Sequence, residues 1–402
     1  MLTPISLLLS LILGFISLAV PLLGLALIYI AFRVPKRPVR VRRNRVYGRR
    51  TEIEEVPVRP ETSWRDRLRN PEVSVPLIAG LCLMAFTLFG RHVVELAFPL
   101  GADEPTNLPG TPSDIMRPDG TNIHVETFGP SDAPTLVLTH GWSTDNREWY
   151  YAKRHLSDRF RLIVWDLPGL GLSAEPKNHD LSLEQMGSDL QQVLTLAQGR
   201  PAVLVGHSIG GMINLTLCRL HPELLGSQVA AVVQVDTTYT NPVRTTKNSR
   251  LSSALQKPVA EPLLHAMIAI SPLVRAAAWL GYQEGIVQLN NARSSFAGTE
   301  TRGQLDLVSR YSYESSPAVV ARGTLAMFHW DGTAVLPNVN VPSLIIVGRE
   351  DSTTLPSASE YMHAAMPKAE LRIEQPGAHY ALLEQNAQVD SAIKEFASAH
   401  AK

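Results

Sequence analysis

The chain has 402 residues, with 37 basic and 37 acidic side chains and a hydrophobic share of 45%. It is longer than one average domain, and its composition is that of a globular protein with an additional segment. The overall balance excludes a generally basic nucleic-acid-binding protein and a disordered chain. Basic residues nevertheless concentrate between Arg33 and Arg69. The two cysteines, Cys82 and Cys218, lie in separate apolar runs and indicate neither a disulfide framework nor a zinc site.

The first apolar run extends from Met1 to Phe32 and contains no charged residue. It is long enough to cross a hydrocarbon core of roughly 30 Å, and it predicts a transmembrane helix at about residues 3–32. A cleaved signal peptide is disfavoured because the positive charges follow the run. The basic segment at residues 33–74 predicts a cytoplasmic loop that contacts anionic lipid headgroups. Its place beside a membrane span argues against a nucleic-acid-binding arm.

A second apolar run begins at Val75 and continues past Gly90 through several charged residues to Leu100. It predicts a second membrane helix at about residues 75–98, with Arg91, His92 and Glu95 near one interface, where charged side chains can snorkel. A shorter helix that lies in the interface is the alternative. Residues 1–100 then form a hairpin, which predicts a multi-pass membrane protein whose residues after Leu100 lie on the non-cytoplasmic side.

The remainder of the chain changes pattern after a linker rich in Pro, Gly and Asp at residues 101–121. Residues 122–402 alternate short apolar strands with helices, which predicts an α/β fold with a mainly parallel sheet covered by helices on both faces. Strands are expected at 123–128, 135–139, 162–165, 202–205, 229–235, 343–347 and 371–373. Helices are expected at 149–156, 182–196, 212–220, 357–366 and 389–399. Apolar helical segments at about residues 240–337 interrupt the alternation and predict a helical cap.

Residues 206–210 read Gly-His-Ser-Ile-Gly and stand between an apolar run and a helical pattern. This is the G-x-S-x-G pattern in a strand-turn-helix setting, which holds the serine on a strained turn with its Oγ exposed. Gly206 and Gly210 let neighbouring backbone pass close to the turn. Ser208 is therefore the candidate nucleophile. The five-residue pattern alone also occurs in turns that have no catalytic role. Whether Ser208 is a nucleophile therefore depends on the residues that accompany it.

A serine nucleophile needs a base to accept its proton, and the base needs an acid that orients it and stabilises its charge. Asp351 and His379 each follow a predicted strand. Both therefore lie at the carboxyl edge of the sheet, where open α/β sheets build their sites. The sequence predicts that they meet Ser208.

Several rival residues remain open. Asp236 also follows a strand and is an alternative acid, and Glu350 is a weaker one. His140 is a rival base, although we expect it to brace its own loop. The other histidines considered are expected to be structural or exposed: His207, His221, His265 and His329. No Cys/His cluster or dinucleotide-binding glycine pattern argues for a metal or a cofactor.

From about residue 120 to its end, the sequence resembles the α/β-hydrolase fold family. The resemblance rests on residues 140–142 (His-Gly-Trp), on residues 166–173, on the turn at Ser208, and on the loops at 348–351 and 377–379. The order of serine, aspartate and histidine is also the order of that family.

The resemblance implies an esterase-like or lipase-like serine hydrolase with a cap. It implies an oxyanion hole formed by the backbone N–H groups of Trp142 and Ile209. The residues around these turns are expected to support it: His140, Gly141, Gly206, His207 and Gly210.

The whole sequence therefore predicts a membrane-anchored serine hydrolase that cleaves carboxylic, lipophilic esters through an acyl-enzyme on Ser208. The expected partners are a small acyl ester and the lipid bilayer, without nucleic acid, metal or cofactor. An acyltransferase, a perhydrolase or a carbon–carbon hydrolase on the same triad is an alternative. A non-catalytic binding protein on the same fold also remains open.

Overall fold

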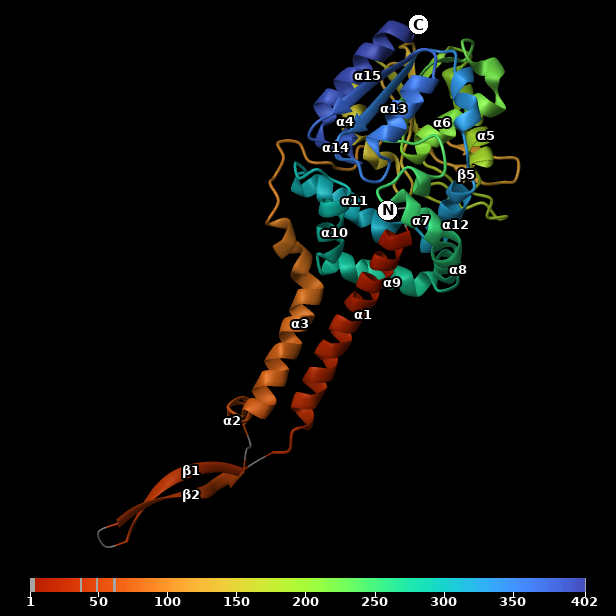
Figure 1. Ribbon diagram of the computed structural model, residues 1–402. Coiled ribbons are helices and arrows are strands. Elements are labelled where there is room, and N and C mark those ends of the chain that lie inside the picture. The colour runs from red at the N-terminus through yellow and green to blue at the C-terminus, as the bar shows by residue number, and fades with distance from the viewer. Residues whose placement is uncertain (1–3, 37, 48–49, 61–62, 402) are drawn as a thin grey trace.

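A computed structural model describes residues 4–36, 38–47, 50–60 and 63–401. Figure 1 shows an α/β domain, a layer of helices beneath it, and a long two-helix stalk that ends in a β-hairpin. Residue 3, where the first helix was expected to begin, lies outside the described residues, as do residues 37, 48–49 and 61–62 of the expected basic loop.

The stalk consists of α1 (Pro4–Arg33) and α3 (Pro71–Glu95). Both helices are long and apolar enough to cross a membrane. They pack closely, because a Cβ atom on Gly80 would lie 2.6 Å from the carbonyl oxygen of Gly24. The second helix starts earlier than residue 75, because Asn70 caps it by accepting a hydrogen bond from the Glu72 N–H and Pro71 suits the first helical position.

Two antiparallel strands, β1 (Pro38–Tyr47) and β2 (Arg50–Pro60), lie between the stalk helices in the sequence. A short helix, α2 (Trp64–Leu68), follows them. We expected only a loop in this region. Residues 39–42 read Val-Arg-Val-Arg, a short strand-like alternation, but the many basic residues of the segment led to the expectation of a loop.

The main sheet has eight strands among the described residues, and its order confirms the predicted mainly parallel α/β architecture. The strands from β12 to β8 run parallel, whereas β6 pairs antiparallel with β8 and β3 pairs antiparallel with β6. In spatial order they are β12 (Ala369–Glu374), β11 (Ser343–Gly348), β10 (Val229–Val235), β9 (Ala202–His207), β7 (Thr135–Thr139), β8 (Arg161–Trp165), β6 (Val125–Phe128) and β3 (Thr111–Pro112).

Helices cover both faces of this sheet, and each face has its own hydrophobic core (Figure 1). One face packs against α5 (Leu183–Leu194), α6 (Ile209–Leu220) and α13 (Pro356–Ala365). The other packs against α4 (Tyr150–Leu156), α14 (Ala381–Glu384) and α15 (Asn386–His400). Because the central strands are buried on both sides, their sequences are continuous apolar runs.

The beginning of the α/β domain differs from the expectation in two ways. The residues expected to form a linker already contribute β3 to the sheet, and β4 (Ile115–Met116) pairs with β5 (Asn122–Ile123). The strand expected at 123–128 is divided at His124, because the backbone N–H of His124 donates to Ser173 Oγ at 2.8 Å and leaves the ladder. Strands of two residues are too short to produce a periodic signal.

The insertion after β10 forms a helical cap between the sheet and the stalk (Figure 1). A bridge between Thr240 and Asp331 closes its base. Its elements are η4 (Pro242–Arg244), α7 (Ser249–Leu255), η5 (Gln256–Ala260), α8 (Glu261–Ala269), α9 (Ser271–Gln283), α10 (Ile286–Ser294), α11 (Arg302–Glu314), α12 (Pro317–Phe328) and η6 (Thr333–Asn338).

Candidate active site

Ser208 occupies the sharp turn between β9 and α6. Its backbone has φ 52° and ψ −118°, a left-handed conformation that is strained for a residue with a side chain. A Cβ atom on Gly206 would lie 2.4 Å from the carbonyl carbon of Gly210, and one on Gly210 would lie 2.2 Å from the Thr139 carbonyl oxygen. Only glycine fits at either position, so the spacing of the motif is a steric requirement of this turn.

Three side chains from different loops meet at this turn. His379 Nε2 lies 3.2 Å from Ser208 Oγ, and His379 Nδ1 lies 2.9 Å from Asp351 Oδ2. Both distances are within hydrogen-bonding reach. The structure thus brings together the three residues that the sequence singled out. In space, His379 lies between Ser208 and Asp351. A serine in this arrangement can lose its proton to the imidazole.

The Asp351 carboxylate is fixed by hydrogen bonds from its own loop. Oδ1 accepts from the backbone N–H groups of Thr353 at 2.7 Å and Thr354 at 3.0 Å, and Oδ2 accepts from Thr354 Oγ1 at 2.7 Å. Donors on both oxygens hold the plane of the carboxylate, so that Oδ2 faces His379. The orientation of the imidazole is therefore set by the loop after β11.

The two rival acids lie close by but hold loops together. Asp236 accepts hydrogen bonds from the N–H groups of Gly348 at 2.8 Å and Ala381 at 3.2 Å. Burial, followed by the nearby negative charge of Asp351, raises the pKa of Asp236 well above its usual range. Glu350 accepts from the Gly377 N–H at 2.9 Å. The carboxylate that hydrogen-bonds His379 is that of Asp351.

His140 is buried and braces two loops. Its Nε2 accepts a hydrogen bond from the Leu167 N–H at 2.9 Å, and its Nδ1 lies 2.8 Å from the Gly141 carbonyl. Of the other histidines, His221 lies beside Glu223 and His329 is exposed near Glu261. No group of three or more His, Cys, Asp or Glu side chains in the described part of the chain could hold a metal ion.

The sequence did not indicate a role for Glu148, and it indicated only a supporting role for His207. His207 donates from Nε2 to the carbonyl oxygen of His379 at 2.8 Å, and its Nδ1 forms a buried ion pair with Glu148. Glu148 also accepts from the Gly141 N–H at 3.2 Å. The pair therefore links the base loop to the turn at residues 140–142. Glu148 lies in η1 (Asn146–Trp149), a turn too short to have a periodic pattern.

This ion pair sets the charge of His207. Burial alone would lower the pKa of His207, but the Glu148 carboxylate outweighs burial and raises it to about 9. Conversely, burial would raise the pKa of Glu148, whereas the His207 charge lowers it. Both residues are therefore charged at neutral pH.

The pair should make stability fall at alkaline pH. The folded pKa of His207, about 9, exceeds its ordinary value of 6.5, so its stabilisation is complete below pH 6.5 and is lost as the pH rises through about 9. We expect the melting temperature of the full-length protein in lipid nanodiscs to fall over this window. A His207→Gln variant should be less stable at pH 6.5 and show a shallower fall. Parallel curves for the two proteins would contradict this role.

The turn at residues 140–142 is held by the cap. Trp142 Nε1 donates to the Val320 carbonyl oxygen at 3.0 Å, and its ring fills the space where a Cβ atom on Gly323 would lie. The next residue, Ser143, has φ 63°, and its carbonyl oxygen accepts from Ser315 Oγ at 2.8 Å. The cap thus fixes the backbone beside Ser208.

Comparisons with known proteins identify the family of this domain. The family model of the alpha/beta hydrolase fold matches residues 134–385. A pimeloyl-[acyl-carrier protein] methyl ester esterase of Nitrosomonas europaea is 28% identical over 62% of this chain and 89% of its own length. The RutD protein of Stutzerimonas stutzeri, to which carbamate hydrolysis has been ascribed, is 26% identical over 64% of this chain and 89% of its own length.

Solved structures show the same fold. The esterase EaEST of Exiguobacterium antarcticum superposes with a TM-score of 0.59 and 21% identity, covering 72% of this chain and 100% of that one. A thermophilic esterase of Thermogutta terrifontis gives a TM-score of 0.59 and 22% identity over 72% and 99% of the two chains. The family match covers more than half of the sequence, and the chain belongs to the alpha/beta hydrolase fold family.

Proposed function

We propose that this protein is a membrane-anchored serine hydrolase that cleaves carboxylic esters through an acyl-enzyme on Ser208. The observation that carries the proposal is the continuous hydrogen-bonding path from Ser208 Oγ to His379 and from His379 to Asp351. A metal or cofactor is not needed for this chemistry, because the nucleophile is activated by its neighbouring base.

The first half of the reaction forms the acyl-enzyme. Ser208 Oγ attacks the carbonyl carbon of the ester while its proton passes to His379 Nε2. The tetrahedral oxyanion then collapses, the bond to the alcohol oxygen breaks, and the alcohol leaves with the proton from His379. In the second half, water attacks the acyl group and gives a proton to His379. The carboxylic acid is released, and Ser208 recovers that proton.

The oxyanion needs donors that are already in place. The Ile209 N–H is proposed as one, because Ile209 begins α6 and the N-terminus of a helix favours negative charge. The Trp142 N–H is proposed as the second, on the turn that the cap and Glu148 hold. Charge that develops on the substrate oxygen would thus be stabilised without movement of the protein.

Ester substrates are supported by the relatives. The N. europaea relative is named for cleaving a methyl ester, and the geometry around Ser208 suits the same bond. The additional stalk favours lipophilic esters, since an enzyme held at a bilayer meets acyl chains at high local concentration.

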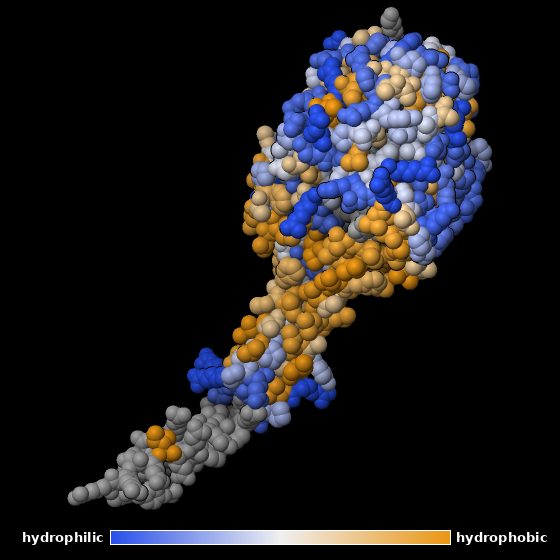
Figure 2. Space-filling view, viewed as in Figure 1, coloured by the Kyte–Doolittle hydropathy of each residue, from blue (hydrophilic) through white to orange (hydrophobic). Residues whose placement is uncertain are grey.

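Anchoring is supported by the surface of the stalk. Leu22 of α1 and Val75 of α3 are 66% and 63% exposed, and Figure 2 shows a nearly continuous apolar surface along the stalk up to the cap. An apolar surface of this extent is not expected to face water. At the other end of the stalk, Arg67 donates to the carbonyl oxygens of Ala31 and Val34, in the region of the basic loop.

The proposed orientation places the basic loop in the cytoplasm and the catalytic domain on the opposite side, because positive loops are retained inside. Protease added to intact cells or spheroplasts should then digest the catalytic domain. A version with an epitope tag in the loop near residue 48 serves as the control, because the tag should remain protected. A catalytic domain that is digested only after the membrane is broken would contradict this orientation.

The nucleophile is tested by covalent labelling. A fluorophosphonate probe should modify the full-length protein, and mass spectrometry of its peptides should locate the adduct on Ser208. His379→Ala should slow the labelling strongly, because the serine then lacks its base. Labelling of a different serine, or equal labelling of Ser208→Ala, would overturn the proposal.

A further inference from the structure

The first stalk helix is longer than a membrane span requires. α1 has 30 residues, which corresponds to about 45 Å at 1.5 Å per residue. A hydrocarbon core is only about 30 Å thick. If its Arg33 end lies at one interface, roughly the first third of α1 lies at or beyond the opposite interface. In Figure 1 this part of α1 is the part that reaches the cap.

The upper part of α1 packs directly on α9 of the cap. A Cβ atom on Gly14 would lie 3.3 Å from Cβ of Ala277, and one on Gly281 would lie 3.2 Å from Ser17 Oγ. Small residues on both helices therefore allow the backbones to approach closely. The anchor and the cap form one packed unit at this level.

The upper end of α3 is docked on the same helix. A Cβ atom on Gly90 would lie 2.7 Å from the carbonyl oxygen of Glu284, directly after α9. Arg91 donates to the Tyr282 hydroxyl at 2.6 Å and lies 3.7 Å from the Asp306 carboxylate. We expected Arg91 to snorkel toward water, whereas it binds the cap. These polar contacts mark the level at which the apolar part of the stalk ends.

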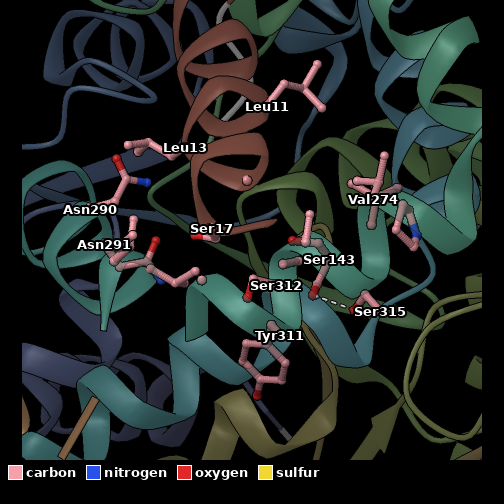
Figure 3. A pocket seen from close by; sticks show the side chains of 18 of the residues that line it. Leu11, Leu13, Ser17, Ser143, Val274, Asn290, Asn291, Tyr311, Ser312 and Ser315 are labelled. Atoms are coloured by element: carbon pink, nitrogen blue, oxygen red, sulfur yellow. Dashed lines mark hydrogen bonds between the residues drawn. The ribbon is translucent and has the colours of Figure 1, made fainter. Parts of the chain in front are cut away.

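A cavity of about 270 Å³ lies between α1 and the cap. Its walls are mainly apolar, with Leu11 and Leu13 from α1 and Val274 and Val287 from the cap among the lining residues. Figure 3 shows Leu11, Leu13 and Ser17 of α1 around the same space as side chains of the cap. The volume is slightly below the range of about 300–1,000 Å³ that is typical of small-molecule sites.

The outer end of this cavity faces the surface that is proposed to contact lipid. Phe15 of α1 and Leu273 of α9 both line the cavity and are 52% and 46% exposed. The apolar surface of the stalk continues over the lower cap at this level (Figure 2). The cavity therefore has exposed apolar side chains in its wall on the surface that is proposed to contact lipid.

The inner end of the cavity lies against the candidate active site. Tyr380 lines the cavity, and its ring makes an edge contact with the His379 ring at a centroid distance of 5.9 Å. Ser143, which also lines it, directly follows Trp142. The cavity thus reaches the residues that directly follow Trp142 and His379 in the chain.

We propose that α1 is a wall of the substrate site, and that the acyl chain of a membrane-resident ester enters this cavity sideways from the bilayer, between α1 and α9. In this proposal the chain lies along Leu11 and Val274, and the ester carbonyl extends past Ser143 and Tyr380 to Ser208. This inference rests on the proposed ester hydrolysis at Ser208. It assigns the anchor a role in substrate binding in addition to attachment.

The lining of the cavity identifies an uncharged hydrocarbon chain as the occupant. None of the lining residues that the structure describes carries a charge. A charged group placed there would lose its hydration without gaining an ionic partner, which is unfavourable. An acyl chain has no such hydration to lose, and the burial of its methylene groups away from water stabilises the complex.

The test compares two substitutions on adjacent residues of α1. Leu11→Trp fills the cavity, whereas Ile12→Trp adds the same ring at a residue that does not line it and is 47% exposed. The full-length proteins are placed in lipid nanodiscs, and kcat/KM is measured for p-nitrophenyl acetate and p-nitrophenyl decanoate. The measured quantity is the ratio of decanoate to acetate hydrolysis.

Leu11→Trp should lower the decanoate-to-acetate ratio by about tenfold or more, the scale of losing a methylene site in a hydrophobic pocket. Ile12→Trp should keep the wild-type ratio, and Leu11→Ala, which enlarges the cavity, should shift the preference toward longer chains. Fluorophosphonate labelling at Ser208 verifies that each variant is folded. An unchanged ratio in Leu11→Trp and Leu11→Ala would overturn the role of α1. Ser208-independent hydrolysis of acetate would instead overturn the proposed function.

Discussion

Replacing Ser208 by alanine is expected to lower kcat for ester hydrolysis by on the order of 10⁶-fold, the scale seen when a triad serine is removed. The hydroxyl that lies 3.2 Å from His379 Nε2 is then absent, and no acyl-enzyme can form. The measurement is steady-state hydrolysis of p-nitrophenyl acetate by the purified full-length protein. Activity within about tenfold of the wild type would mean that another group is the nucleophile.

A glycine at the same position provides a matched control. Ser208 has φ 52°, and a strained backbone of this kind costs about 1–3 kcal/mol. Both Ser208→Ala and Ser208→Gly should be inactive, but only glycine relieves the strain. We therefore expect Ser208→Gly to melt at a higher temperature than Ser208→Ala. Equal melting temperatures would indicate that the turn is not strained.

The positions around Ser208 could be predicted because the fold restricts where polar residues collect. Parallel strands end at one edge of the sheet, so residues directly after β9, β11 and β12 must lie near one another. Asp351 and His379 follow two of these strands, and the structure places His379 beside Ser208 and Asp351 beside His379. The alternation of apolar strands and helices likewise predicted the α/β sheet, which the strand order confirms.

The support around the site could not be predicted in the same way. Glu148 pairs with His207 and accepts a hydrogen bond from the Gly141 N–H, yet it lies in a short helical turn and not directly after the end of a strand. Tyr380 directly follows His379, and nothing in the sequence distinguishes it from other loop residues. In the structure it lines the cavity, and its ring contacts the His379 ring. Such contacts depend on tertiary packing, which leaves no local sequence pattern.

The contact of α1 with the cap could not be predicted from the sequence, for a different reason. A helix that is apolar on all sides gives the same signal whether a given side faces lipid or protein. Leu11 and Ile12 are therefore indistinguishable in the sequence, although only Leu11 lines the cavity. The cap helices gave a clear helical signal, but their sequence did not indicate that they would pack on the stalk.

Replacing Asp351 by asparagine is expected to lower kcat by on the order of 10⁴-fold, because an amide in this position favours the wrong imidazole tautomer and removes the charge that stabilises imidazolium. Its Oδ2 lies 2.9 Å from His379 Nδ1. The rest of the loop should keep its shape, since the N–H groups of Thr353 and Thr354 can still donate to an amide oxygen. The loss should appear in kcat, with fluorophosphonate labelling slowed in parallel.

Asp236→Asn distinguishes this assignment from its rival. Asp236 is fully buried, and its oxygens accept N–H groups from Gly348 and Ala381 instead of contacting the imidazole. Burial raises its pKa, and asparagine keeps the shape of the side chain and an oxygen that can accept one of the two N–H groups. We expect this variant to stay within about tenfold of the wild-type kcat while melting at a lower temperature. If Asp236→Asn lost activity by thousands-fold and Asp351→Asn did not, the roles of the two carboxylates would be reversed, and His379 would have to change partner during turnover.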